Sequence, residues 1–367
     1  MNAYAPEPAS RAVLDDLQSR LRATRRIALP RGVGWERGTD AEYLSELLRY
    51  WAEFYDWRAH EHRILALPWV RTGTGATVLR SVHQRARGAS APVVVLLHGW
   101  PDSVLRFQRV LPLLSDVHVV VPALPGFPFA DALHEPGMSV TTMAEVVAGS
   151  LAELGYARYV VSAGDVGGDV AEQLAAAYPD RVDALHLTSL SPRHLRGIDA
   201  SLLSPAEREA LASAQRWQMN EGGYIAEQST KPHSLAPGLG DSPAGLAAWI
   251  VEKLRSWSDC GGDVESVFAR DDLLTWITAY WVTGTIGTSF SSYVERPRPV
   301  ARVDVPTAMS IYPHDIKIGT RAFAERFLNV RAWTEYGAGG HFAAWEQPDT
   351  YVQGVREALS LRPIRAS

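Results

Sequence analysis

Apolar runs of strand length alternate with stretches of helical periodicity through the middle of this chain. Residues 93–97 form a continuous apolar run, and similar runs lie at 117–121, 159–162 and 184–188. A strand that is apolar at every position is typical of a parallel sheet with both faces covered. Right-handed crossovers place the intervening helices on the two faces. The pattern therefore predicts an α/β fold with a mostly parallel central sheet.

The segment before these runs has a different pattern. Residues 13–22 and 41–55 carry apolar side chains at helical spacing, and residues 77–84 alternate as expected for a first strand. These features predict an N-terminal helical extension that leads into the sheet. Its two amphipathic helices could wrap the core or join two copies of the chain in a homodimer, and the sequence leaves both uses open.

The strand-like runs stop near residue 189 and resume only at 306–311 and 332–336. The interval is mostly helical in pattern and rich in Trp, Tyr and Phe, which predicts a helical lid over the carboxyl ends of the strands. We therefore expect three parts: an N-terminal helical region with the first strand or strands (1–90), an α/β core (91–189 and 300–367) and the lid (190–299).

Composition narrows the classes of function. The 367-residue chain carries a net charge of −5, which argues against nucleic acid or an anionic membrane surface as a partner. It has one cysteine, Cys260, which excludes an internal disulfide framework and suits a reducing cytoplasm. The first residues lack the pattern of a signal peptide, and no apolar run approaches the length of a membrane span. We expect a soluble cytoplasmic protein with no membrane partner.

The most informative local pattern is Val-Val-Ser-Ala-Gly-Asp-Val-Gly-Gly-Asp at residues 160–169. An apolar run ends there, small residues surround Asp165, and a stretch compatible with a helix begins at once. This layout is typical of a nucleophile elbow, a strand-to-helix turn so sharp that only small residues fit around the reactive one. The alternative interpretation is a Gly-rich loop in which Asp165 caps the helix.

A carboxylate in place of the usual serine changes the chemistry of such an elbow. An attacking carboxylate forms an alkyl ester with the substrate rather than an acyl enzyme. The expected substrates are therefore strained or activated alkyl electrophiles, such as epoxides or alkyl halides.

A nucleophile of this kind also needs donors for an oxyanion. The sequence His-Gly-Trp-Pro at 98–101 directly follows the apolar run at 93–97. In a sheet of this type that loop faces the elbow, so the backbone N–H of Trp100 can join that of Val166 as an oxyanion hole. The alternative is an ordinary strand-to-helix turn. Asp102 and Ser103 are expected to cap a helix rather than to take part in catalysis.

The base and the acid follow the later strands. His341 has glycines on its N-terminal side and lies just past the last strand, which makes it the candidate base. Asp315 follows the run at 306–311 and can accept the ring N–H of His341, fixing its tautomer. The order Asp165, Asp315, His341 is the nucleophile-acid-base order of α/β-hydrolases.

Taken together, these residues resemble the epoxide hydrolases of the α/β-hydrolase fold, in the branch related to the microsomal enzyme. The resemblance covers nearly the whole chain. Its motifs are Tyr50-Trp51 and Asp56-Trp57-Arg58-Ala59-His60-Glu61 near the N-terminus, His98-Gly99-Trp100-Pro101, the Asp165 elbow and Gly339-Gly340-His341-Phe342-Ala343-Ala344-Trp345-Glu346 in the core, and Gly223-Tyr224, Gln228-Ser229-Thr230-Lys231-Pro232, Asp241-Ser242-Pro243-Ala244-Gly245-Leu246 and Thr283-Gly284-Thr285-Ile286 in the lid.

The resemblance implies an activity and a set of site residues. It implies that two lid tyrosines, by motif position Tyr224 and Tyr293, hydrogen-bond the epoxide oxygen as the ring opens. Asp165 then carries the ester, His341 activates the water that cleaves it, and a vicinal diol leaves without any metal or organic cofactor. The residues expected to line the substrate pocket are Trp100, Pro101, Val166, Trp281 and Phe342.

Some positions depart from the family pattern. The family usually has Trp after the nucleophile, where this chain has Val166, and often Arg ahead of the second tyrosine, where it has Ser291. The acid, often Glu in this branch, is Asp315. Because two large side chains are lost, we expect a bulky, natural-product-type epoxide as substrate.

Three other functions compete with this interpretation. A haloalkane dehalogenase shares the Asp nucleophile but normally holds its halide with a Trp donor where Val166 stands. An epoxide-opening cyclase would use a carbon or hydroxyl of the substrate in place of water, with Asp165 as base, and the sequence does not separate it from a hydrolase. An inactive ligand-binding homologue would more often have lost Asp165 or His341.

Overall fold

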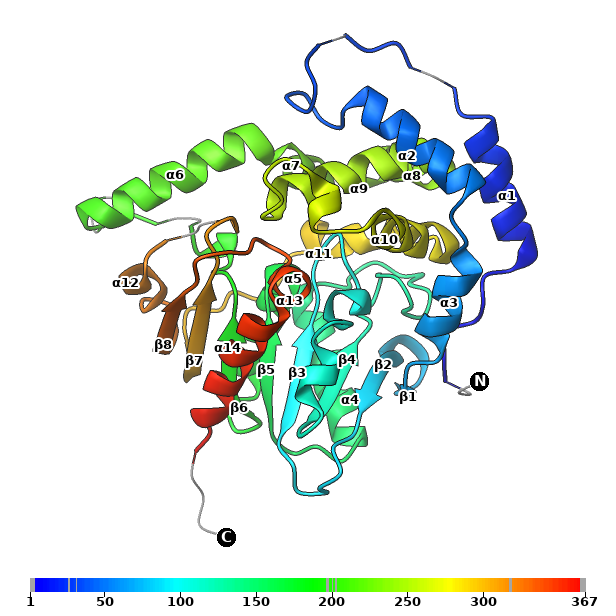
Figure 1. Ribbon diagram of the computed structural model, residues 1–367. Helices are drawn as coiled ribbons and strands as arrows, with labels where there is room; N and C mark the ends of the chain where they lie inside the picture. The colour runs from blue at the N-terminus through cyan, green and yellow to red at the C-terminus, as the bar shows by residue number, and fades with distance from the viewer. Residues whose placement is uncertain are drawn as a thin grey trace.

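A computed structural model of the protein describes residues 4–25, 27–30, 32–195, 198–199, 201, 203–316 and 319–363. The centre of the fold is an eight-stranded sheet (Figure 1). Its strands are β1 (Trp69–Thr72), β2 (Leu79–Gln84), β3 (Val93–Leu97), β4 (His118–Pro122), β5 (Tyr159–Ala163), β6 (Val182–Leu187), β7 (Val303–Ile311) and β8 (Leu328–Glu335).

The order of the strands across the sheet is β1-β2-β4-β3-β5-β6-β7-β8. β1 and β2 are antiparallel to their neighbours, and every pairing from β4 to β8 is parallel. Every residue of β3, β4 and β5 is buried, as expected for strands covered on both faces. The prediction of a mostly parallel sheet is confirmed.

Helices cover both faces of this sheet. α4 (Val140–Glu153) and α5 (Asp165–Ala177) pack together on one face, where α5 contacts β5, β6 and β7. α14 (Pro348–Ser360) packs on β6 and β7 from the opposite face and lies in front of the sheet in Figure 1. Short helices in the core connections are α12 (Arg321–Ala324), α13 (Ala343–Glu346), and the 3₁₀ helices Gly75–Thr77, Val104–Phe107, Leu111–Leu114 and Pro192–Leu195.

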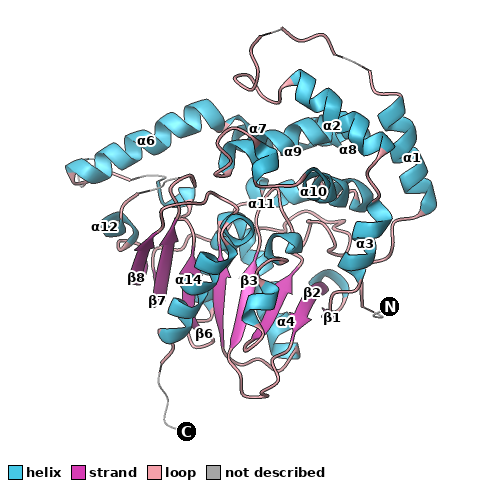
Figure 2. Cartoon of the chain, viewed as in Figure 1, coloured by secondary structure: helices cyan, strands magenta, loops and turns pink. Residues whose placement is uncertain are grey.

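A layer of helices lies over one end of the sheet (Figures 1 and 2). That end carries the carboxyl ends of the parallel strands, including the β5–α5 turn. The layer consists of α6 (Pro205–Glu221), α7 (Gly223–Thr230), α8 (Pro232–Asp241), α9 (Pro243–Trp257), α10 (Arg270–Thr283) and α11 (Ser291–Val294), with the 3₁₀ helices Val264–Ser266 and Thr288–Phe290. The segment expected to form a lid therefore lies above the predicted site.

The N-terminal helices pack against this layer. They are α1 (Arg11–Arg22), α2 (Ala41–Glu53) and α3 (Trp57–Leu65), capped by the side chains of Ser10, Asp40 and Asp56. The apolar faces of α1 and α2 are buried and contact α9. The structure places these helices on the lid layer, and the homodimer that the sequence left open stays a prediction.

Two elements were not anticipated. The strand expected at 77–84 is β2, and the four-residue strand β1 precedes it. α3 was also missed, because its middle is a run of polar residues. Within the described residues, none of the helices has both the length and the apolar character that a bilayer crossing requires.

Candidate active site

The turn between β5 and α5 has the geometry of a nucleophile elbow. β5 ends at Ala163 and α5 begins at Asp165, whose φ is +54°. A positive φ is strained for a residue with a side chain and is typical of functional turns. The turn also needs glycine at position 167, because a Cβ there would lie 2.4 Å from the carbonyl oxygen of Leu97 on β3. Helix and strand cross too closely for any larger residue.

The carboxylate of Asp165 lies against the loop after β3. Its Oδ1 accepts a hydrogen bond of 2.8 Å from the backbone N–H of Trp100. Gly99 makes this approach possible, since a Cβ at that position would lie 2.4 Å from Oδ1. The structure thus brings the predicted donor Trp100 to the predicted nucleophile, while the N–H of Val166 lies in the first turn of α5.

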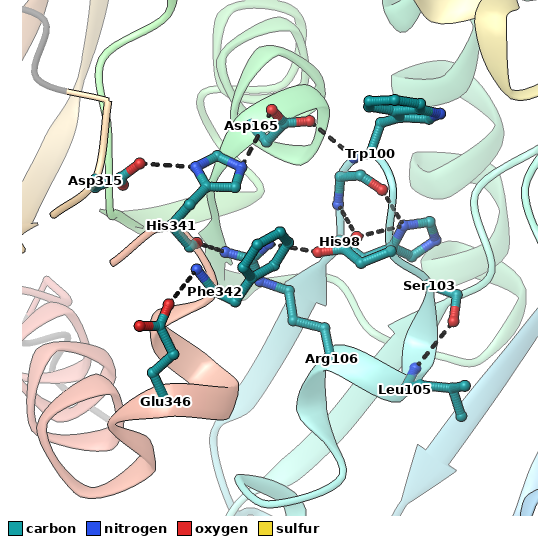
Figure 3. A network of polar contacts seen from close by, with 12 residues as sticks. His98, Trp100, Ser103, Leu105, Arg106, Asp165, Asp315, His341, Phe342 and Glu346 are labelled. Atoms are coloured by element: carbon teal, nitrogen blue, oxygen red, sulfur yellow. Dashed lines mark hydrogen bonds and ion pairs between the residues drawn. The ribbon is translucent and has the colours of Figure 1, made fainter. Parts of the chain in front are cut away.

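His341 lies between two carboxylates, as Figure 3 shows. Its Nδ1 is 2.7 Å from Oδ1 of Asp315, and its Nε2 is 3.3 Å from Oδ2 of Asp165. The Asp315 oxygen also accepts the N–H of Ile316 at 2.7 Å, which fixes the carboxylate in place. The three residues that the sequence proposed as nucleophile, base and acid are therefore adjacent in space.

The two carboxylates dominate the protonation of His341. Burial alone lowers the pKa of its imidazole, but Asp315 and Asp165 together outweigh burial and raise the pKa to about 10. At neutral pH the ring is an imidazolium that shares its charge with both acids.

A buried arginine that the sequence analysis missed supports the His341 loop. Arg106 donates hydrogen bonds to Oδ2 of Asp102 and to the carbonyl oxygen of His341. Burial raises the pKa of Asp102, yet Arg106 and His98 overcome this and lower it to about 2. Ser103 caps a short helix as expected, accepting the N–H of Leu105. Asp102, which was also expected to cap a helix, instead binds Arg106 and accepts the N–H of Gly99 at 2.7 Å.

Glu346 holds the other side of the same loop. Its carboxylate accepts the N–H groups of Phe342 at 2.8 Å, Gly340 at 3.0 Å and Asp259 at 2.7 Å. The N–H of His341 itself donates to the carbonyl of Trp257 at 2.7 Å. The loop is thereby tied to the end of α9 in the lid as well as to the core.

The two predicted tyrosines lie above Trp100. The ring of Tyr224, on α7, stacks on the Trp100 ring with 5.4 Å between centroids, and Tyr293, on α11, meets it edge-on at 6.1 Å. Tyr224 and Tyr293 are 6.1 Å apart between ring centroids. Burial and, to a smaller extent, the charge of Asp165 raise the pKa of both phenols well above the usual value. Both are therefore neutral hydrogen-bond donors.

Three of the residues expected to line the pocket are buried next to the catalytic groups or their neighbours in the chain. Val166 and Pro101 are buried beside Asp165 and Trp100 in the chain. Phe342 is fully buried and packs edge-on against His341, with 5.2 Å between the ring centroids. The ring of Trp281 lies 5.9 Å from the guanidinium carbon of Arg20 on α1, and its place in the pocket stays a prediction. α10 has no clear apolar face, so an aromatic residue on it could not be assigned to a face from sequence.

A groove adjoins the site on the Asp315 side. It has a volume of about 280 Å³ and lies between α6, the end of α9 and the loop after β7. Trp217, Trp257 and Asp315 are among its lining residues. Within the described part of the chain, no three His, Cys, Asp or Glu side chains are grouped as a metal site.

The fold and this arrangement define a class of protein. A mostly parallel sheet of this topology, a nucleophile elbow after its central strand, and an acid and a histidine in two later loops are those of an α/β-hydrolase. The family model for the alpha/beta hydrolase fold matches residues 92–244, and the model for the epoxide hydrolase N terminus matches residues 7–107.

Similarity to individual proteins narrows the class. The chain is 34% identical to a Stigmatella aurantiaca protein whose name assigns it to the epoxide hydrolases, over 97% of this chain and 83% of the relative. It is 27% identical to epoxide hydrolase 1 of Sus scrofa, over 95% and 86% of the two chains. The chain belongs to the epoxide hydrolase family.

Solved structures agree with this assignment. The epoxide hydrolase of Aspergillus niger superimposes with a TM-score of 0.86 at 26% identity, covering 98% of this chain and 97% of that one. The juvenile hormone epoxide hydrolase of the silkworm Bombyx mori gives a TM-score of 0.87 at 26% identity, covering 97% and 93%. The similarity therefore includes the N-terminal helices and the lid as well as the core.

Proposed function

We propose that this epoxide hydrolase works through a covalent alkyl ester on Asp165. The observation that carries the proposal is the setting of that carboxylate, with Oδ1 held 2.8 Å from the Trp100 N–H and Oδ2 3.3 Å from Nε2 of His341. Oδ2 attacks one epoxide carbon, and the carbon–oxygen bond of the ring breaks. Oδ1 stays against its donor and becomes the carbonyl oxygen of the ester.

The departing oxygen takes its hydrogen bonds from the two phenols. Tyr224 and Tyr293 belong to lid helices and contact the Trp100 ring, and both remain protonated because their pKa values are raised. A neutral donor that can release a proton suits an oxygen on which negative charge develops. Removal of either hydroxyl is expected to slow ester formation.

Ester formation prepares His341 for the second step. Esterification removes the charge of Asp165, one of the two anions that raise the pKa of His341. The pKa of the imidazole then falls, so the ring passes its proton through solvent to the phenolate left by the first step, and the neutral ring acts as a base toward water while Asp315 holds Nδ1. Water gives one proton to Nε2 of His341 and attacks the ester carbonyl, and the oxyanion forms at Oδ1 near the N–H groups of Trp100 and Val166. When the bond between the acyl carbon and the ester oxygen breaks, that oxygen takes the proton back from His341 and the diol leaves.

We propose a bulky epoxide as the substrate. Val166 and Ser291 stand where related enzymes commonly carry larger side chains. The groove beside Asp315 offers about 280 Å³, near the lower end of ligand pockets at roughly 300–1,000 Å³. It suits a large substituent rather than a whole polycyclic molecule. If turnover of styrene oxide clearly exceeded that of a fused-ring epoxide, this part of the proposal would fail.

The experiment that tests the mechanism uses the variant His341→Gln. This variant keeps the nucleophile but lacks the base, so the ester is expected to accumulate after incubation with an epoxide. Mass spectrometry of the Asp165 peptide should show the added mass of the epoxide. The double variant Asp165→Asn/His341→Gln is the matched control and should show no adduct; an adduct there, or none in the single variant, would contradict the proposal.

A further inference from the structure

One buried cation lies directly against a proposed proton donor. Nζ of Lys253, on α9, is 5.1 Å from the centroid of the Tyr224 ring, and it is 5.9 Å from the ring centroids of both Trp249 and Trp257. The Lys253 side chain is only 9% exposed. Trp249, Lys253 and Trp257 are four residues apart in turn and therefore share one face of α9. Lys253 and Trp257 on this face both contact the ring of Tyr224.

The choice of lysine at this position is itself informative. The chain has 36 basic residues, and only three of them are lysines. Arginine stacks on aromatic faces more readily, whereas lysine presents a compact charge. Lys253 is therefore one of few lysines in the chain, and it places a compact charge among three aromatic rings.

The charge has a use in the reaction proposed above, on which this inference rests. When Oδ2 of Asp165 attacks the epoxide carbon, the electron pair of the broken carbon–oxygen bond goes to the ring oxygen. That oxygen takes the hydroxyl proton of one phenol. The negative charge of Asp165 has then moved to a buried phenolate, which needs a nearby cation to be stable.

We propose that Lys253 is a positioning residue that makes Tyr224, rather than Tyr293, the phenol that gives its proton to the epoxide oxygen. The ammonium lies over the Tyr224 ring, and an aromatic ring that becomes anionic attracts a cation more strongly than a neutral ring does. Tyr293 has no such cation contact among the described residues. Its element is instead held at Ser292, whose carbonyl oxygen accepts a hydrogen bond of 3.0 Å from Arg193.

The groups around Tyr224 act in opposite directions. Glu252, the neighbour of Lys253 on α9, forms an ion pair with it and also accepts the hydroxyl of Ser256 at 2.9 Å. Its charge and that of Asp165 on the elbow disfavour a phenolate at Tyr224. From α11 the facing titratable group is the neutral phenol of Tyr293. Lys253 is the cation in contact with the Tyr224 ring.

The test measures the rate of ester formation in a single turnover, with tryptophan fluorescence as the signal and styrene oxide as the probe. Lys253→Met should slow this step roughly 30-fold, the equivalent of a desolvated cation–π contact, and Lys253→Arg should recover part of the loss. Glu252→Gln should change the rate in the opposite sense, by a fewfold increase. Arg255→Met is the control, because that residue on the same helix lies over Trp35, with 4.6 Å between the guanidinium carbon and the ring centroid.

The decisive measurement is whether the effect of Lys253→Met on ester formation depends on the hydroxyl of Tyr224. In a Tyr224→Phe background Lys253→Met should have no further effect, whereas in a Tyr293→Phe background its full effect should remain. Equal slowing in all backgrounds, or slowing by Glu252→Gln as large as that by Lys253→Met, would mean that the pair is only structural and would overturn the inference. If Tyr224→Phe itself left ester formation unchanged, the fault would lie in the proposed role of the tyrosines instead.

Discussion

At the scale of single residues, the site depends on the space and charge that surround Asp165. The carboxylate fits because position 99 has no side chain, and its partner His341 is charged because two acids face it. These two properties can be varied separately, since one is steric and the other electrostatic. Each gives a prediction.

Gly99→Ala should reduce turnover about 100-fold or more. The new Cβ would lie 2.4 Å from Oδ1 of Asp165, so the carboxylate must move away from the Trp100 N–H, and a displacement of about 1 Å can cost about two orders of magnitude. Steady-state kinetics on any accepted epoxide would measure this. Gly149→Ala on α4, where a Cβ meets nothing within 4 Å, should leave the rate unchanged; similar rates for both variants would refute the steric argument.

The charge of His341 predicts a pH dependence of stability. The pKa is about 10 in the folded chain, above the value of roughly 6.5 of an unfolded chain. The contribution to the free energy of unfolding is therefore complete below pH 6.5 and is lost as the pH rises through 10. Chemical denaturation of the wild type and His341→Gln should show a difference that shrinks across this range. A difference that grows toward high pH would contradict the assignment.

The same scale shows what sequence could and could not reveal about the site. Asp165, His341 and Asp315 were found because each sits in a pattern of small residues or at the end of a strand. Arg106 and Lys253 were missed because a buried charge and a surface charge look alike in a sequence. Only the packing of distant elements distinguishes them.

At the scale of elements, strands were predicted where burial on both faces leaves an uninterrupted apolar run. β3, β4 and β5 are such strands. β1 was missed because it is an edge strand of only four residues with an exposed arginine. Such a short strand shows no clear alternation of apolar and polar residues. Helix faces within the lid were equally unresolved, so the place of Trp281 in the pocket stays a prediction.

The contact between the short helix Val104–Phe107 and the His341 loop can be tested. Arg106→Met removes the partner of buried Asp102 and the donor to the His341 carbonyl. Breaking a buried pair costs about 3–5 kcal/mol, so the free energy of unfolding should fall by that amount and turnover should fall with it. Arg109→Met, which removes a half-exposed guanidinium 4.0 Å from the Trp345 ring centroid, should cost about 1 kcal/mol or less. Equal losses would contradict the role of Arg106.

At the scale of the whole molecule, the N-terminal helices and the lid form one packed unit above the sheet. Thr39 donates to the carbonyl of Ala248 at 2.6 Å, and Tyr50 donates to Asp271 at 2.9 Å. The lid in turn holds the His341 loop through Trp257. The extension predicted from residues 1–90 therefore stabilises the layer that carries both tyrosines.

The central claim is that the substrate becomes bonded to Asp165 before water enters. A single turnover in ¹⁸O-labelled water, with enzyme in excess over the epoxide, tests it most directly. The account predicts that the diol carries no label and that mass spectrometry finds the label in the Asp165 peptide, because water attacks the ester carbonyl. Label in the diol of the first turnover, with none in Asp165, would contradict the account.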